Sequence, residues 1–245
     1  MRRMIPHNIQ YVLGQQVRHA SGTTKPPVLL NDAEAKALLG KFFNLAYLQK
    51  IVEKGRSAIQ PRNAQTPVPE AGLLAIAAYT SAGLDRMIHE TYFSGGGPAD
   101  RRDAVKALEG LIQGTLPTIA LTKFDVVKRN MTMDPSEVRT LYRPGALISF
   151  ERITSVTLQP HQVYRGGNLD LTIKPYLGVV NVSTLSTFSG SHDRAEREGM
   201  LDPGGVYEVT HMESGREDSP LDAGNKQKSL HSENWKIVLR EIGPS

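Results

Sequence analysis

The sequence has no cysteine among its 245 residues, so disulfide bonds, thiol nucleophiles and cysteine-ligated metal sites are excluded. Long hydrophobic runs are also missing. No stretch approaches the roughly 20 apolar residues that a membrane-spanning helix needs, and we expect no membrane span. With 39% hydrophobic and 22% charged residues, the composition is that of an ordinary globular protein.

Acidic residues are missing from the first 31 positions, which do contain arginine and lysine. The apolar stretch Ile9 to Leu13 is interrupted by Gln10, so it does not resemble the hydrophobic segment of a secretory signal peptide. Such a composition is typical of a disordered leader or of a targeting signal. We expect residues 1–30 to be such a leader and residues 31–245 to form one folded domain.

The net charge of +4 would be compatible with a nucleic-acid-binding protein. The basic residues are interleaved with acids, however, as in 101–103 and 194–198. This pattern favours a solvated surface of mixed charge, with part of the positive excess left for a diphosphate cofactor, and we expect no nucleic-acid partner. The seven histidines are scattered and no pair has the spacing of ligands on a helix, so we expect no metal site.

The first half of the chain has helical periodicity. Asn31 is a good N-cap for a first helix that Gly55 would end, and two further helices are expected over 70–92 and 99–113. From Thr118 onward the apolar runs are short, several alternate with period two, and turn residues separate them, as in strands. Helices followed by strands predict an α+β fold.

The most informative run begins with Glu196 and Glu198, two carboxylates two positions apart, and continues through Pro203-Gly204 into an alternating strand over 206–209. In an extended segment this spacing places both carboxylates on one face, whereas on a helix they would point about 200° apart. By itself such a pair also occurs at exposed strand ends, so other residues have to support a functional interpretation.

This run resembles the catalytic segment of arginine-specific mono-ADP-ribosyltransferases of the bacterial toxin and effector type. Those enzymes carry an arginine, a serine and a Glu-x-Glu pair in chain order. Ser155 stands in a segment similar to their serine strand, and Arg129 stands in one similar to their arginine strand. Val156 and Asn130 depart from the small hydroxyl residue and the glycine that are usual there.

The helix containing Tyr79-Thr80 resembles the Tyr-Thr helix of the same family, so the resemblance covers roughly residues 31–242. A second register remains open, in which Arg165, Ser186 and Glu233 would supply the three motifs. In the preferred register Tyr164 and Arg165 fall instead in a loop that the family uses to contact phosphate and nicotinamide.

The resemblance implies helices packed on two small, roughly perpendicular sheets, with NAD bound between the sheets as a substrate. It assigns to Glu198 the stabilisation of positive charge on the ribose, and to Glu196 the orientation of an acceptor arginine. Arg129 would bind the phosphates, and Ser155 would hold the carboxylate of Glu198. A carboxylate near a developing oxocarbenium ion lowers the barrier to breaking a glycosidic bond.

Three functions are therefore weighed. The first is a secreted monomeric toxin or effector, translocated into a host cell, which modifies a host protein. The second is a non-catalytic protein-binding module on a degenerate form of the same fold, which the departures at Val156 and Asn130 would favour. The third is a basic nucleic-acid binder, whose binding would weaken steeply with salt.

Overall fold

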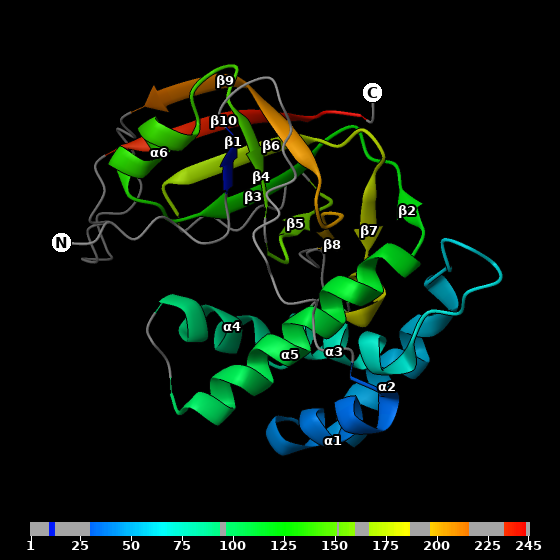
Figure 1. Ribbon diagram of the computed structural model, residues 1–245. Helices are drawn as coiled ribbons and strands as arrows, with labels where there is room; N and C mark the ends of the chain where they lie inside the picture. The colour runs from blue at the N-terminus through cyan, green and yellow to red at the C-terminus, as the bar shows by residue number, and fades with distance from the viewer. Residues whose placement is uncertain are drawn as a thin grey trace, which may run out of the picture.

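The computed structural model describes residues 30–93, 97–150, 152–159, 167–186, 197–215 and 233–243, together with the backbone of residues 10–12. The helices are α1 (Asp32–Phe42), α2 (Leu45–Gly55), α3 (Glu70–Ser81), α4 (Leu84–Phe93), α5 (Ala99–Thr115) and α6 (Pro135–Leu141). Figure 1 shows α1 to α5 in a layer below the strands, and α6 beside the strands, away from that layer. The structure also describes three 3-10 turns: η1 (Arg56–Ala58) after α2, η2 (Leu116–Thr118) after α5 and η3 (Ser183–Leu185) after β7.

Two of the helices expected to be continuous are divided. The first is broken at Phe43, whose backbone is extended, and Asn44 then caps α2 by accepting a hydrogen bond of 3.2 Å from the backbone N of Tyr47. The second is broken before α4 by Gly83, which has a φ of 88°, in the left-handed region. Helix α6 was not expected, because its seven residues are too few to give a clear period.

Helix α3 lies at the centre of the helical layer. Nine of its twelve residues are buried, so it is apolar around most of its circumference rather than along one stripe. At Gly72 a side chain would place its Cβ only 1.9 Å from Oγ1 of Thr115 on α5. The glycine therefore allows α3 and α5 to pack closely, and α3 can reach from the helical core toward the sheet.

The strands form a curled mixed sheet in the order β1-β4-β9-β10-β6-β3-β5-β8-β7-β2. Their bounds are β1 (Gln10–Val12), β2 (Leu121–Thr122), β3 (Val127–Met131), β4 (Leu147–Ser149), β5 (Ser155–Thr157), β6 (Leu169–Lys174), β7 (Val179–Asn181), β8 (Glu198–Met200), β9 (Val206–Gly215) and β10 (Asn234–Glu241). The α+β class is confirmed, with helices packed on a curled sheet. Two separate sheets were expected, but hydrogen bonding joins all the strands.

The sheet has two halves, β1-β4-β9-β10-β6-β3 and β5-β8-β7-β2, and the join between them is narrow. Strands β3 and β5 share one residue pair, Lys128 opposite Thr157, whereas β3 and β6 share five. Two apolar cores accompany the two halves: the helices pack with Val180 and Met200, and the larger half of the sheet packs around residues such as Leu171. Because only this one residue pair connects them, the two halves can belong to one hydrogen-bonded sheet and still pack around separate cores.

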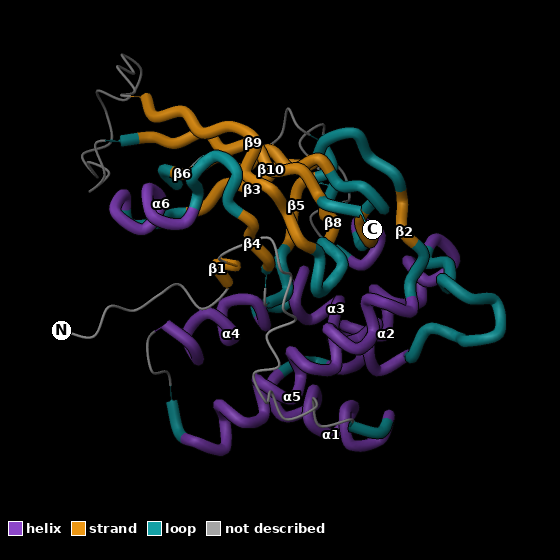
Figure 2. The backbone as a smooth tube through the Cα atoms, turned by 45° about the horizontal axis from the view of Figure 1, so that its top comes forward, coloured by secondary structure: helices purple, strands orange, loops and turns teal. Residues whose placement is uncertain are grey.

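Within the segment expected to be a leader, Gln10–Val12 pair with Leu147–Ser149 as the edge strand β1. The other residues of 1–29 lie outside what the structure describes. Figure 2 shows β1 at the end of the sheet next to β4, and β5 and β8 above α3. None of the helices described is long and apolar enough to cross a membrane.

Candidate active site

Three adjacent strands carry the three motif residues of the preferred register. Arg129 lies in the middle of β3, Ser155 is the first residue of β5, and Glu198 is the first residue of β8. Because the sheet order is β3-β5-β8, residues up to 69 positions apart in sequence are brought to one place. That place is above α3 in Figures 1 and 2.

Arg129 is held directly against the serine strand. Its Nη1 atom donates a hydrogen bond of 2.6 Å to the backbone oxygen of Ser155 and lies 3.3 Å from the Ser155 hydroxyl oxygen. Hydrogen bonds from a charged donor are stronger than neutral ones, so this contact fixes one edge of a planar group. The other donors of a guanidinium fork can then meet a second anion or acceptor.

The backbone around Glu198 is fixed from β7 and η3. Its carbonyl oxygen accepts hydrogen bonds of 3.1 Å from the backbone N of Val182 and from the hydroxyl of Ser183. The next residue, Gly199, has no room for a side chain, since a Cβ there would lie 2.5 Å from Cδ2 of Leu158. The backbone at the start of β8 is therefore held by contacts that do not involve the Glu198 side chain.

Helix α3 adds a tyrosine to this group. Burial raises the pKa of Tyr79 to about 12, while the nearby Arg129 guanidinium lowers it, and the Glu198 carboxylate raises it. A hydrogen bond joins the Tyr79 side chain to Ser155. Sequence reasoning singled out the Tyr79-Thr80 helix but gave Tyr79 no role. That resemblance was the one signal available, because nothing in the local sequence shows that α3 reaches the sheet.

The two departures from the family pattern have structural explanations. Val156 is 3% exposed and belongs to the apolar core of the sheet, on the face opposite to Ser155 and Thr157. An apolar residue is therefore suited to its position. Asn130 accepts a hydrogen bond of 2.6 Å from the backbone N of Gly167 and donates one of 2.5 Å to Asp170, so its amide ties β3 to the start of β6.

Glu196, Tyr164 and Arg165, which the sequence analysis also assigned to the site, lie outside the described residues. In the second register, Arg165 is likewise not described, while Glu233 forms an ion pair with Arg139 of α6.

The other described member of that register, Ser186, lies elsewhere. It follows η3, which is tied to α3 by a hydrogen bond of 2.8 Å from the Thr80 hydroxyl to the Leu185 carbonyl oxygen. Figure 1 shows α6 and β7 on opposite sides of the strand layer. The structure therefore does not bring Glu233 and Ser186 together.

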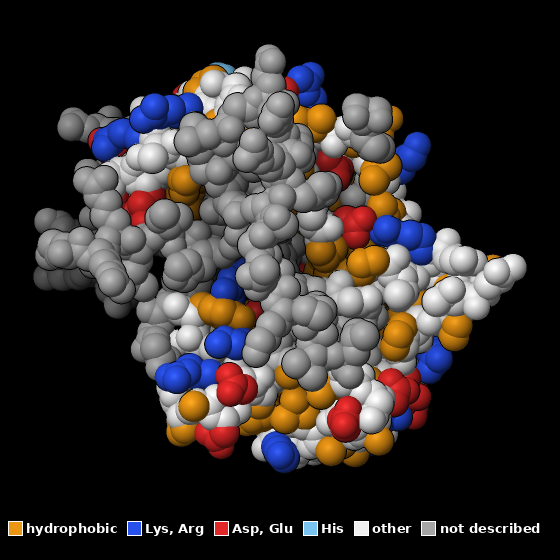
Figure 3. Space-filling model, viewed as in Figure 1, with side chains coloured by type: hydrophobic (Ala, Val, Ile, Leu, Met, Phe, Trp, Pro, Cys, Tyr) orange, Lys and Arg blue, Asp and Glu red, His pale blue; other side chains and the backbone are white. Residues whose placement is uncertain are grey.

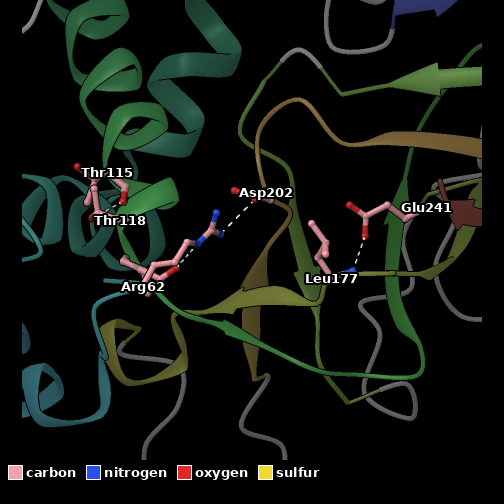
Figure 4. Close-up of polar contacts among 7 residues, drawn as sticks. Arg62, Thr115, Thr118, Leu177, Asp202 and Glu241 are labelled. Carbon is pink, nitrogen blue, oxygen red and sulfur yellow. Dashed lines mark hydrogen bonds and ion pairs between the residues drawn. The ribbon is translucent and has the colours of Figure 1, made fainter. Parts of the chain in front are cut away.

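The end of β8 is connected to the helical layer by an ion pair. Nη2 of Arg62 lies 3.1 Å from Oδ2 of Asp202, and Nε of Arg62 donates a hydrogen bond of 3.3 Å to the carbonyl oxygen of Ile119 (Figure 4). Arg62 belongs to the connection between α2 and α3, so this connection contacts the chain just after β8.

On the face drawn in Figure 3, described basic and acidic side chains are interspersed over the helices. Among the described residues, no group of three or more histidine and acidic side chains is arranged to hold a metal ion.

Comparison with known proteins finds similarity in structure. No family model and no curated protein matches the sequence. The type III effector XopAI from Xanthomonas axonopodis pv. citri is 14% identical, with a TM-score of 0.60 over 86% of this chain and 82% of that one. Exoenzyme S from Pseudomonas aeruginosa, solved in complex with human 14-3-3 protein beta and bound to carba-NAD, is 14% identical, with a TM-score of 0.52 over 86% and 88%.

The ADP-ribosyltransferase toxin Plx2a from Paenibacillus larvae is 14% identical, with a TM-score of 0.48 over 86% of this chain and 96% of that one. The two likenesses with TM-scores above 0.5 extend over most of both chains. The chain therefore has the fold of XopAI and exoenzyme S, the ADP-ribosyltransferase-like fold.

Proposed function

We propose that the protein is a mono-ADP-ribosyltransferase that transfers ADP-ribose from NAD to a protein side chain, with arginine as the acceptor. The observation that carries the proposal is the meeting of Arg129, Ser155, Glu198 and Tyr79 at the junction of β3, β5, β8 and α3. Binding of carba-NAD by exoenzyme S, which shares the fold, supports NAD as the substrate.

In the proposed reaction, the bond between the nicotinamide nitrogen and C1 of the ribose breaks, and positive charge develops on the ribose. The carboxylate of Glu198 stabilises that charge, and does so most strongly where water is excluded. The partly buried side chain of Tyr79 lies near Glu198 and adds apolar surface to this end of the site. Arg129, held by its contact with Ser155, binds the diphosphate with its remaining donors.

The acceptor arginine has to be oriented and must lose a proton, because a protonated guanidinium is a poor nucleophile. We propose that Glu196 does this, since a carboxylate can accept paired hydrogen bonds from the guanidinium fork and assist proton removal. Two positions from Glu198, it lies on the same face if the segment is extended. We also assign Tyr164 and Arg165 to contacts with the phosphate and nicotinamide.

The biological setting proposed is that of a secreted effector or toxin, translocated into a host cell and acting as a monomer on a host protein. The support is that XopAI is a type III effector and that exoenzyme S was solved with a human 14-3-3 protein. The acid-free first 31 residues are compatible with an export signal.

The test is transfer of label from NAD, tagged on its adenine, to proteins of a host-cell lysate. We expect labelling by the wild type, and expect a free guanidino compound in excess to suppress it while free asparagine does not. Glu208→Gln, which should label like the wild type, is a matched control for Glu198→Gln, because Glu208 is a partly exposed glutamate paired with Arg240 on the neighbouring strand. Intact NAD and unlabelled proteins after incubation with wild type would favour the binding module instead.

A further inference from the structure

Strand pairing places a threonine, rather than the serine of the motif, opposite the proposed catalytic carboxylate. In the β5–β8 ladder, Thr157 is the partner of Glu198, and Ser155 is the partner of Met200. Directly opposed residues of antiparallel strands point to the same face, with Cβ atoms about 4.5–5.5 Å apart. A threonine hydroxyl at that separation is within reach of a glutamate carboxylate.

Among the residues that the structure describes, the hydroxyl of Thr157 has no hydrogen-bond partner. The residue is 3% exposed, and its Oγ1 atom is buried and unsatisfied. A buried hydroxyl without a partner costs folding free energy, and valine would fill the same volume without that cost. Buried hydroxyls without a partner are therefore rare, and those that occur are expected at positions where function requires the hydroxyl.

The Ser155 hydroxyl, in contrast, is already engaged. It lies 3.3 Å from Nη1 of Arg129 and is joined by a hydrogen bond to the side chain of Tyr79. These contacts connect Ser155 to the arginine and to α3, so they suit a role in holding Arg129. A different group is then needed to orient the carboxylate of Glu198.

We infer that Thr157 is a positioning residue for Glu198, whose hydroxyl donates a hydrogen bond to the Glu198 carboxylate when NAD is bound. The inference rests on the proposed function. It assigns different roles to the two hydroxyl residues: Ser155 holds Arg129, and Thr157 holds Glu198. The hydroxyl keeps its proton throughout. Donation to the ionised form favours the charged carboxylate, which is the form that stabilises the ribose cation.

The experiment compares Thr157→Val and Thr157→Ser with the wild type in NAD consumption, thermal melting and pH dependence. For Thr157→Val we expect kcat to fall about tenfold with KM for NAD changed less than twofold, and the acid limb of the kcat profile to move to higher pH. Its Tm should be equal to or above that of the wild type, because an unsatisfied hydroxyl has been removed. Thr157→Ser should restore most of kcat.

Thr154→Val provides a matched control on the same stretch of chain. Thr154 is also 3% exposed, but its hydroxyl donates a hydrogen bond of 3.0 Å to the carbonyl oxygen of Arg152. Here we expect the opposite pattern, a lower Tm with kcat unchanged. The two variants make the same chemical substitution, so only the place of the hydroxyl differs.

An active wild type whose kcat and pH profile are unaffected by Thr157→Val would overturn the inference and leave the proposed function intact. A lower Tm together with an unchanged pH profile would show a structural role and would also overturn it. If the wild type consumes no NAD and labels no protein, both the inference and the proposed function fail, and the wild-type measurement alone reveals that case.

Discussion

The two faces of the β5–β8 pair carry different kinds of side chain, although successive residues of each strand alternate between them. The face toward α3 carries Ser155, Thr157 and Glu198, and the face toward the sheet core carries Val156 and Gly199. Substitutions on the first face should alter the reaction, and substitutions on the second should alter stability. The alternation of a β-strand thus separates chemistry from packing within three residues.

The same comparison explains why a loose motif can still mark a site. Val156 departs from the family pattern on the core face, where packing decides the residue, while Ser155 and Glu198 match it on the face toward α3. A mismatch therefore has to be weighed by the face on which it lies. Judged in that way, the departure at Val156 gives no support to a degenerate, non-catalytic site.

The largest effect on the kinetics of the reaction is expected at Arg129, which lies on β3, the strand next to β5. Replacement by methionine keeps much of the side-chain volume and removes the charge and the contact with Ser155. We expect KM for NAD to rise about 100-fold, equivalent to about 2.7 kcal/mol of binding, with a smaller change in kcat. Steady-state kinetics of NAD consumption measure both, and an unchanged KM would remove Arg129 from the NAD site.

On the core face, Gly199→Ala should have the largest cost in stability. The added Cβ would lie 2.5 Å from Cδ2 of Leu158 and 3.3 Å from Cγ2 of Val179, so both side chains have to shift. Overpacking of this kind costs about 1–3 kcal/mol, and urea unfolding should show it as a lower midpoint. Gly114, whose Cβ would meet nothing within 4 Å, is the control for the substitution itself.

Val156→Thr should give a smaller effect, confined to stability. The change restores a residue closer to the family pattern, but it places a hydroxyl in the apolar core of the sheet. We expect a loss of about 1–2 kcal/mol in unfolding free energy and a kcat within twofold of the wild type. A gain in kcat would contradict the separation of the two faces, because it would mean that position 156 takes part in the reaction.

The sequence predicted the fold class more completely than the site. Apolar periodicity was sufficient for α+β, but it continued across Asn44 and Gly83, where the helices are in fact broken. The reason is that a cap or a left-handed residue ends a helix without disturbing the spacing of its apolar positions.

The meeting of Arg129, Ser155 and Glu198 depends on the order of the strands, which no local pattern specifies. The sequence could suggest it only through the family resemblance. The opposition of Thr157 and Glu198 depends further on register, and a slip of one residue would turn Glu198 to the other face. Strand order and register are set by contacts between distant segments, so the structure was needed for both.

The most direct test of the central claim is the initial rate of NAD consumption by Glu198→Gln and Glu233→Gln beside the wild type. Glutamine keeps the shape of glutamate and removes the charge. If the site lies at Arg129, Ser155 and Glu198, the rate falls about 1000-fold or more in Glu198→Gln and stays within twofold in Glu233→Gln, whose ion pair with Arg139 is exposed. A loss of activity in Glu233→Gln with Glu198→Gln still active would contradict the account and move the site to the second register.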